Sequence, residues 1–182
     1  MNNKTLVAAA LSSLVAACGG GEDGAGYCVG SFAGGSSTWG CINCSGVDGA
    51  GDRTEFDRSI DNNSNTGAAF SLGASSGEIE IDVRAPSGMS FPAGVDAGAL
   101  IRFPQGTYSS ISVRFNTYRG NVQVDSLQGG EGATAGNVPG AGQAVYYSVN
   151  PTLEFDRLEA VIEATGGAEP AAFEVFEFCG DR

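Results

Sequence analysis

Hydrophobic side chains in this sequence recur at every second position in short runs, and no long run follows the 3.6-residue period of an amphipathic helix. The clearest run is 78–83, where three acidic residues alternate with three β-branched ones. Residues 110–125 form another, and the turn-forming residues 118–121 within it predict a β-hairpin. Each of these runs predicts a strand with one face against a core.

Five further segments show the same pattern and are expected to be strands: 69–72, 100–103, 145–149, 158–164 and 172–178. The composition of 158–164 would also suit a helix, but its alternation and its β-rich flanks favour a strand. Phenylalanines at alternating positions are expected in the core: Phe115, Phe173, Phe176 and Phe178. About eight short strands divided by turn residues predict an all-β fold, an antiparallel β-sandwich or jelly roll.

The N-terminus has the features of a secretory signal. Lys4 supplies the positive charge, and the apolar stretch 6–17 is too short to span a bilayer. The segment ends in Leu-Val-Ala-Ala-Cys, which resembles the bacterial lipobox, where the cysteine is lipidated and becomes the mature N-terminus. The resemblance implies lipidation of Cys18 and attachment to a membrane through the lipid. The alternative is an ordinary signal cut near Ala17, with a free Cys18.

These features divide the chain into three parts: a lipoprotein signal peptide (1–17), a lipidated Gly-rich tether (18–26) and a single β-sandwich domain (27–182). Glu22 and Asp23 lie beyond the position that usually retains a lipoprotein at the inner membrane. The expected address is therefore the outer membrane or cell surface, reached by secretion through the inner membrane.

Four cysteines remain once Cys18 carries lipid, an even set in an oxidising compartment: Cys28, Cys41, Cys44 and Cys179. Two disulfides are expected, and unless Cys179 is free one of them ties the end of the chain to its start. Of the three possible pairings we favour Cys28–Cys41 with Cys44–Cys179. The alternatives are a redox pair at Cys41 and Cys44, which would normally open a helix, and a four-thiolate zinc site, which would need reduced thiols.

Composition excludes several classes of function. The chain has no His, and 9 basic residues against 21 acidic ones give a net charge of −12. Without His, Ser-His-Asp and Cys-His mechanisms and His-bound metals are excluded, and the negative charge argues against nucleic acid as a partner. Four acidic residues share a Gly-rich segment that predicts a solvated loop or a second cation site: Asp48, Asp52, Glu55 and Asp57. Glycoside hydrolysis would need two carboxyls held across a cleft, so we do not expect an enzyme.

The segment 59–66 is the strongest candidate for a cation site. Asp61, Asn63 and Asn65 place oxygen ligands at alternate positions of a turn, as Ca²⁺ prefers. The spacing does not match an EF-hand. The alternative interpretation is a polar β-turn with Asx caps, which needs no metal.

The same segment carries a family resemblance. Ile60-Asp61-x-Asn63-x-x-Thr66, followed by Ala-Phe-Ser-Leu at 69–72, resembles the "aIDGnxxT" element of discoidin-like (F5/8 type C-like) galactose-binding-type jelly rolls. The likeness covers roughly residues 41–179. It implies a jelly-roll fold and structural Ca²⁺ held by Asp61, Asn63 and Thr66.

The chain also departs from the family pattern. Asn62 stands where the family has Gly, and Ala172 stands where it usually places a metal-binding Glu at the start of the last strand. Glu174 or Glu177 could take the place of that Glu. A cysteine near the N-terminus bridged to the last strand is also common in the family.

The resemblance also implies a function. Such folds bind sugars or other surfaces through loops at one end, often with exposed aromatic side chains. The aromatic candidates are Trp39, Tyr108, Tyr118 and either Tyr146 or Tyr147, of which we take Trp39 and Tyr118 as the ligand-binding pair. We expect a non-catalytic cell-surface module that binds glycan or matrix. The alternative is a structural or assembly lipoprotein of the envelope with a protein partner, which predicts an exposed apolar patch or an open edge strand.

Overall fold

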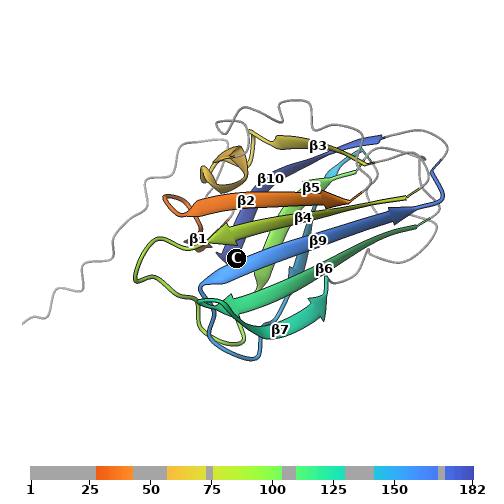
Figure 1. Ribbon diagram of the computed structural model, residues 1–182. Helices are drawn as coiled ribbons and strands as arrows, with labels where there is room; N and C mark the ends of the chain where they lie inside the picture. Colours follow the sequence, from red (N-terminus) through yellow and green to blue (C-terminus); the bar gives the residue numbers. More distant parts are fainter. Residues whose placement is uncertain (1–27, 43–56, 73–75, 104–109, 130–141, 168–170) are drawn as a thin grey trace, which may run out of the picture.

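The structure is a computed structural model that describes residues 28–42, 57–72, 76–103, 110–129, 142–167 and 171–182 (Figure 1). The strands are β1 (Gly30–Ser31), β2 (Ser36–Ile42), β3 (Ala68–Leu72), β4 (Ser76–Arg84), β5 (Ala97–Arg102), β6 (Ser110–Arg119), β7 (Val122–Gln128), β8 (Ala144–Val149), β9 (Arg157–Thr165) and β10 (Ala171–Asp181), and the 3₁₀ helix η1 covers Asp57–Ile60. The all-β prediction is confirmed, as are all eight predicted strands.

The strands form two antiparallel five-stranded sheets. Sheet A has the order β1-β10-β5-β8, with β3 also paired to β10, and sheet B has the order β2-β4-β9-β6-β7. In Figure 1 sheet B lies in front and the strands of sheet A are seen behind it. Strand β9 therefore pairs with β4 and β6, while β10, which follows it in sequence, belongs to the opposite sheet.

Aromatic and β-branched side chains from both sheets fill the space between them. The Phe103 ring lies 5.6 Å from Phe173 and 5.7 Å from Tyr147, and Phe70 stacks on Phe173 at 5.3 Å, measured between ring centroids. Burying a phenylalanine contributes up to about 3 kcal/mol relative to leaving it exposed. The four phenylalanines predicted to be buried are buried, although Phe176 lies outside this cluster, beneath the guanidinium of Arg102.

The described disulfide joins Cys28 to Cys179, so both favoured pairings, Cys28 with Cys41 and Cys44 with Cys179, are wrong. The reason is topological, because β1 pairs with β10 in sheet A and brings Cys28 to the end of the last strand. Cys41 lies in β2, which pairs with β4 in sheet B. The expected tie between the two ends of the domain is confirmed, and a four-thiolate zinc site is excluded because two of its ligands are bonded to each other. Cys18 and Cys44 lie outside the described residues.

Several turns gather at the end of the sandwich where the C-terminus lies, on the left of Figure 1. We call this the terminal end; its turns are 32–35, 85–96, 119–121 and 150–156. Backbone hydrogen bonds hold the turns together: Phe91 and Phe155 form a bridge, the Ala85 amide donates to the Asp156 carbonyl, and the Asp156 amide donates to the Tyr118 carbonyl. No helix among the described residues has the length and apolar character needed to cross a membrane.

Candidate functional site

The Asp61 turn is closed by its own polar side chains. The Asp61 carboxylate accepts from the Asn63 amide at 2.8 Å and from the Thr66 hydroxyl at 2.7 Å. The Asn63 side-chain oxygen accepts from the Asn65 amide at 3.1 Å. Asn62 takes a φ of 60°, the left-handed conformation that Gly adopts most easily and that Asn tolerates better than most residues. Asp61, Asn63 and Thr66, predicted as a set, therefore do come together.

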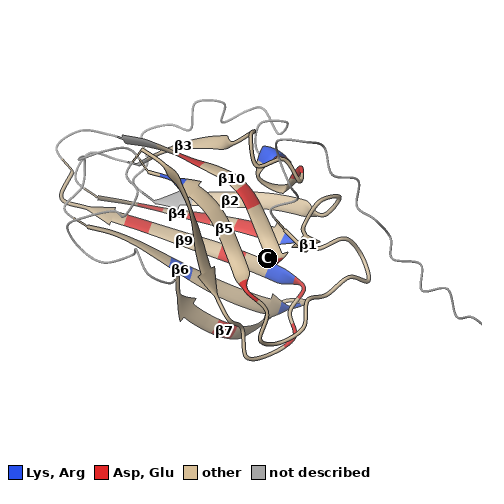
Figure 2. Cartoon of the chain, turned by 180° about the vertical axis from the view of Figure 1, so that it is seen from behind, with Lys and Arg blue, Asp and Glu red and all other residues tan. Residues whose placement is uncertain are grey.

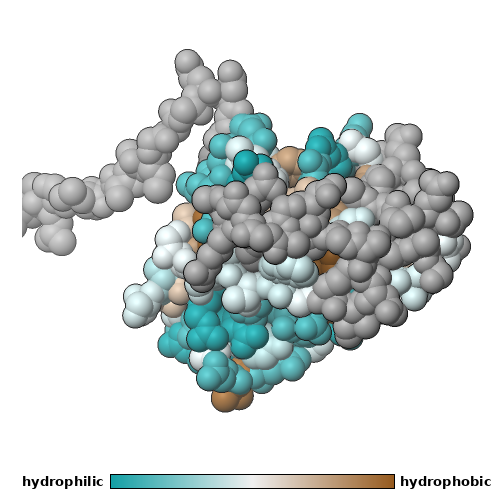
Figure 3. All heavy atoms as spheres, turned by 45° about the horizontal axis from the view of Figure 1, so that its top comes forward, coloured by the Kyte–Doolittle hydropathy of each residue, from teal (hydrophilic) through white to brown (hydrophobic). Residues whose placement is uncertain are grey.

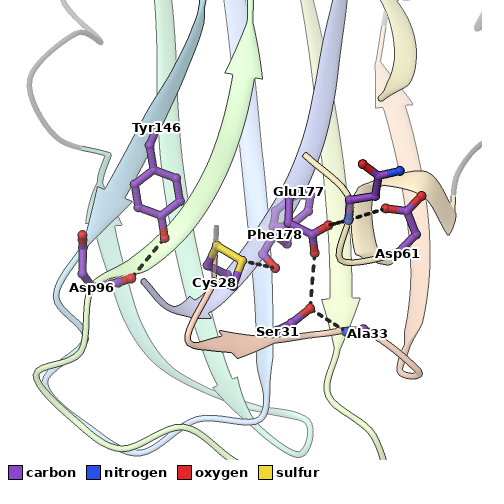
Figure 4. The surroundings of a disulfide bond; sticks show 10 residues. Cys28, Ser31, Ala33, Asp61, Asp96, Tyr146, Glu177 and Phe178 are labelled. Carbon is purple, nitrogen blue, oxygen red and sulfur yellow. Dashed lines mark hydrogen bonds between the residues drawn. A yellow bond between two sulfur atoms is a disulfide. The ribbon is translucent and has the colours of Figure 1, made fainter. Parts of the chain in front are cut away.

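Glu177 of β10 lies against this turn (Figure 4). Its carboxylate accepts from the Asn63 amide at 3.1 Å and from the Ser31 hydroxyl at 3.4 Å, and the residue is only 1% exposed. Burial raises the pKa of Glu177 to about 8, and the negative charge of the Asp61 carboxylate acts in the same direction. Of the two glutamates considered from sequence, Glu177 reaches the turn, whereas Glu174 pairs with Arg102.

The oxygen atoms at this place fit a hard cation. Two carboxylates approach each other across one N–H group, and the Thr66 hydroxyl and the Asn63 carbonyl and amide oxygens lie beside them. Carboxylate, carbonyl and hydroxyl oxygens are the ligands Ca²⁺ takes in proteins. Within the described ranges no three acidic or cysteine side chains gather as a ready-made metal site, so neutral oxygens would supply the remaining ligands here.

The two aromatic candidates do not form one platform. Trp39 pairs with Ile81, whose side chain is in the core, so Trp39 lies on the inner side of edge strand β2, where it is 38% exposed. Tyr118 pairs with Arg157 on the opposite, outer side of sheet B. Three strand spacings separate β2 from β6, roughly 14 Å. The sequence shows both residues, but it does not show the strand order that separates them.

Tyr118 belongs to a connected group of polar side chains on the outer side of sheet B. We call this group the Tyr118 network; its members are Asp82, Asn116, Tyr118, Arg157 and Glu159. The Glu159 carboxylate accepts from the Tyr118 hydroxyl at 2.8 Å and from the Asn116 amide at 2.7 Å. The Arg157 guanidinium pairs with Asp82 and lies 4.2 Å above the Tyr118 ring.

The network is more enclosed than solvent-facing strand positions usually are. Asn116 is 8% exposed, and the side chains of Glu159 and Asp82 are 13% and 17% exposed. Burial raises the pKa of Tyr118 to about 12, and its hydrogen bond to Glu159 acts in the same direction. Burial also raises the pKa of Asp82, against the opposing effect of Arg157. A fixed set of donors and acceptors on a sheet face is a candidate binding surface.

A cleft of about 410 Å³ adjoins this network at the terminal end. Its polar lining includes Ser36, Arg84 and Asp156, and Met89 supplies an apolar wall. Arg84 pairs with Arg157 in the β4–β9 register, and Arg157 pairs with Tyr118 in the β6–β9 register. The cleft therefore adjoins the cross-strand row of paired residues that contains Tyr118. Both carboxylate oxygens of Asp156 accept from the Gly120 amide, at 2.9 and 3.1 Å, and these bonds fix the Asp156 side of the cleft.

The other predicted candidates lie elsewhere. Tyr147 is in the core, and Tyr146 lies on sheet A, where it donates to the Asp96 carbonyl and packs under Arg182. Asp57 accepts from the Ser37 hydroxyl at 3.2 Å. Four candidates lie outside the described residues: Asp48, Asp52, Glu55 and Tyr108.

Comparison with protein-family models finds no matching family, and comparison with curated protein sequences finds no match. Among the structural neighbours are carbohydrate-binding modules with β-sandwich folds and a Ruminococcus gnavus GH29 fucosidase, which is 15% identical over 78% of this chain and 24% of its own, with a TM-score of 0.34. A chitosan-binding module 2 from Paenibacillus sp. IK-5, in complex with chitotriose, is 16% identical over 81% of this chain and 95% of its own, with a TM-score of 0.45. A family 32 module from C. perfringens NanJ, in complex with galactose, is 14% identical over 76% of this chain and 92% of its own, with a TM-score of 0.39. A module described for promiscuous specificity is 10% identical over 84% of this chain and 61% of its own, with a TM-score of 0.49.

Proposed function

We propose that this protein is a non-catalytic glycan-binding module, carried to the cell surface by a lipid on Cys18. The observation that carries the proposal is the Tyr118 network beside the terminal-end cleft. Sugar hydroxyls both donate and accept hydrogen bonds, so sugar sites combine charged and amide groups with an apolar or aromatic surface. The outer side of sheet B offers that combination in one place.

The distribution of exposed hydrophobic side chains gives less support to the alternative function, an envelope protein that binds a protein partner. The exposed large hydrophobic side chains of the described residues stand on five separate segments: Val29, Trp39, Met89, Val122 and Leu153. The described surface visible in Figure 3 is mainly hydrophilic, with small separate brown areas. At edge strand β7 the turn before β9 contacts the sheet, because the Thr152 amide and hydroxyl both donate to the Asp125 carboxylate.

A glycan array probed with the full chain in detergent tests the glycan proposal. Tyr118→Ala is expected to weaken binding roughly tenfold, since loss of one aromatic contact with its hydrogen bond is worth about 1.4 kcal/mol. Tyr146→Ala, the same change on sheet A, is the matched control and is expected to leave binding unchanged. A folded chain that binds no glycan, or two variants that bind alike, would overturn the proposal.

We also propose that Ca²⁺ binds at Asp61, Asn63, Thr66 and Glu177. Its role there would be structural, because it would neutralise the buried Glu177 carboxylate and join the turn to β10. Calcium at about 100 times its dissociation constant would stabilise the fold by about 2.7 kcal/mol, which corresponds to a rise in Tm of roughly 5–10 °C. Glu177→Gln is expected to abolish that rise and Glu174→Gln to keep it. Equal Tm values in calcium and in EDTA would refute the site.

A further inference from the structure

We propose that the terminal end of the sandwich rests on the membrane that holds the Cys18 lipid, with exposed apolar side chains of its turns inserted into the lipid interface. The inference rests on the proposed lipid anchor and goes beyond the proposed glycan function, because it assigns a second binding surface. Its partner is a zwitterionic lipid surface, since a net charge of −12 opposes binding to anionic lipid.

Most of the exposed large hydrophobic side chains of the described residues lie at the terminal end. Of the five, only Trp39 stands within a strand away from this end, in β2. Met89 belongs to turn 85–96, Leu153 belongs to turn 150–156, and Val122 directly follows turn 119–121. Val29 precedes Gly30, which pairs with Asp181 beside the C-terminus. These four side chains are between 44% and 83% exposed.

The four side chains stand on separate segments of the chain and do not form one continuous apolar patch. A protein partner would need a complementary pocket for each of them. A lipid interface accepts separate apolar side chains wherever they reach it, because it adapts its shape to the protein. The arrangement therefore favours lipid as the partner of this end.

The longest turn of the terminal end is uncharged, although the chain as a whole is strongly acidic. Residues 85–95 contain no charged side chain, and Met89, Pro92 and Ala93 within them are exposed. Figure 2 shows this turn in tan on the right of the view, beyond the end of β4.

The charged side chains of the neighbouring turns neutralise one another in part. The Arg119 guanidinium lies 3.2 Å from the Glu154 carboxylate and 3.5 Å from the Asp156 carboxylate. Charges that enter a lipid interface lose hydration, and the cost is smaller where they are already paired. The terminal end can therefore approach lipid with little unpaired charge.

The covalent path from the lipid leads to the same end of the molecule. The disulfide to Cys179 fixes Cys28 near the end of β10. Cys18 precedes Cys28 by ten residues, which can span at most about 35 Å. A lipid on Cys18 would hold the terminal end within that distance of the bilayer. This proximity raises the effective concentration of lipid, so a few weakly inserting side chains suffice for docking.

Docking in this way leaves the proposed glycan surface accessible. The strands of sheet B run toward the terminal end in Figure 1, so the outer side of the sheet faces sideways and not into the bilayer. The Tyr118 network lies on that outer side. Met89 also lines the cleft beside the network, so the cleft would open next to the lipid surface.

The test is tryptophan fluorescence of the full lipidated chain in phosphatidylcholine vesicles, with brominated acyl chains as the quencher. Trp39→Phe removes the single native tryptophan. In that background Leu153→Trp and Met89→Trp report on two turns of the terminal end. Gln143→Trp is the matched control, because Gln143 is exposed and precedes β8, whose other end leads into turn 150–156.

We expect brominated lipid to lower the emission of both terminal-end reporters by roughly half or more, because inserted side chains lie at the acyl boundary. The emission of the control is expected to stay unchanged. Adding Val29→Ser and Val122→Ser to the Leu153→Trp chain should remove roughly half of the quenching, since less apolar surface would then enter the lipid.

The outcomes separate this inference from the other proposals. Equal quenching of the control and the terminal-end reporters, or no quenching in vesicles that carry the chain, overturns the docking and keeps the lipid anchor. Quenching that the two serine substitutions leave unchanged also overturns it. A chain that does not float with the vesicles overturns the docking and the anchor together. None of these results bears on the glycan function, which the glycan array decides.

Discussion

Glu177 is the residue whose chemistry fits its surroundings least, because its carboxyl group is buried beside the Asp61 carboxylate. The Asp61 turn could be predicted from sequence, since its contacts join residues no more than five positions apart. Glu177 lies 114 positions from Asn63, and only the packing of β10 against the turn brings them together. The sequence therefore predicted the turn and left its buried partner undecided between Glu174 and Glu177.

The raised pKa of Glu177 predicts how stability depends on pH without calcium. In the unfolded chain this carboxyl loses its proton near its ordinary pKa of 4.5, whereas in the folded chain it keeps the proton up to about 8. The folded state therefore binds more protons between these values, and stability falls as pH rises through that window. The loss should be on the order of 3 to 5 kcal/mol.

Chemical denaturation in EDTA at several pH values measures this. Glu177→Gln should remove most of the slope, while Glu174→Gln, on the same strand but partly exposed, should keep it. A wild-type free energy of unfolding that is flat or rises between pH 4.5 and 8 would contradict the assignment.

At the scale of the element, the alternation of hydrophobic and polar residues predicts where the strands lie, but it does not predict which strands are neighbours in a sheet. Strand β2 was missed because its sequence, Ser-Ser-Thr-Trp-Gly-Cys-Ile, is mostly polar and lies at the edge of a sheet. The pairing of β9 with β4 and β6 depends on contacts far apart in sequence, which alternation cannot report. The face on which Tyr118, Arg157 and Glu159 meet was therefore not predictable.

Strand β10 shows a second limit of prediction from alternation. Phe173 and Val175 point into the core, so strict alternation would bring Glu177 inside and Phe178 outside. A bulge between Val175 and Glu177 reverses the order, placing Phe178 in the core and Glu177 toward the Asp61 turn. Bulges redirect side chains in this way and have no reliable sequence signal of their own.

The disulfide between Cys28 and Cys179 closes a loop with a sequence separation of 151. In the chain-entropy model such a bond stabilises the fold by about 5 kcal/mol, because it restricts the unfolded chain. The paired variant Cys28→Ser, Cys179→Ser should lose a comparable amount in the free energy of unfolding. A loss below about 1 kcal/mol would show that the pairing of β1 with β10 holds the ends together without the bond.

At the scale of the whole molecule, the domain is an acidic sandwich that we propose is anchored by its N-terminus. Changing Cys18→Ser should abolish incorporation of labelled fatty acid and move the protein from the membrane fraction to the soluble or precursor fraction. A lipid label retained by the variant, or its absence from the natural chain, would contradict the anchor. Gln143→Ala serves as the control, since it changes an exposed residue and leaves both Cys18 and the disulfide in place.

The central claim is that glycan binds on the outer side of sheet B. Hydrogen–deuterium exchange of the full chain, with and without the glycan that binds best on the array, tests it most directly, because bound ligand slows exchange where it contacts the fold. We predict slower exchange in peptides from β6 and β9, which carry Tyr118, Asn116 and Glu159, and no change in β5 or β8 of sheet A. Protection confined to sheet A, or none at saturating ligand, would contradict the account.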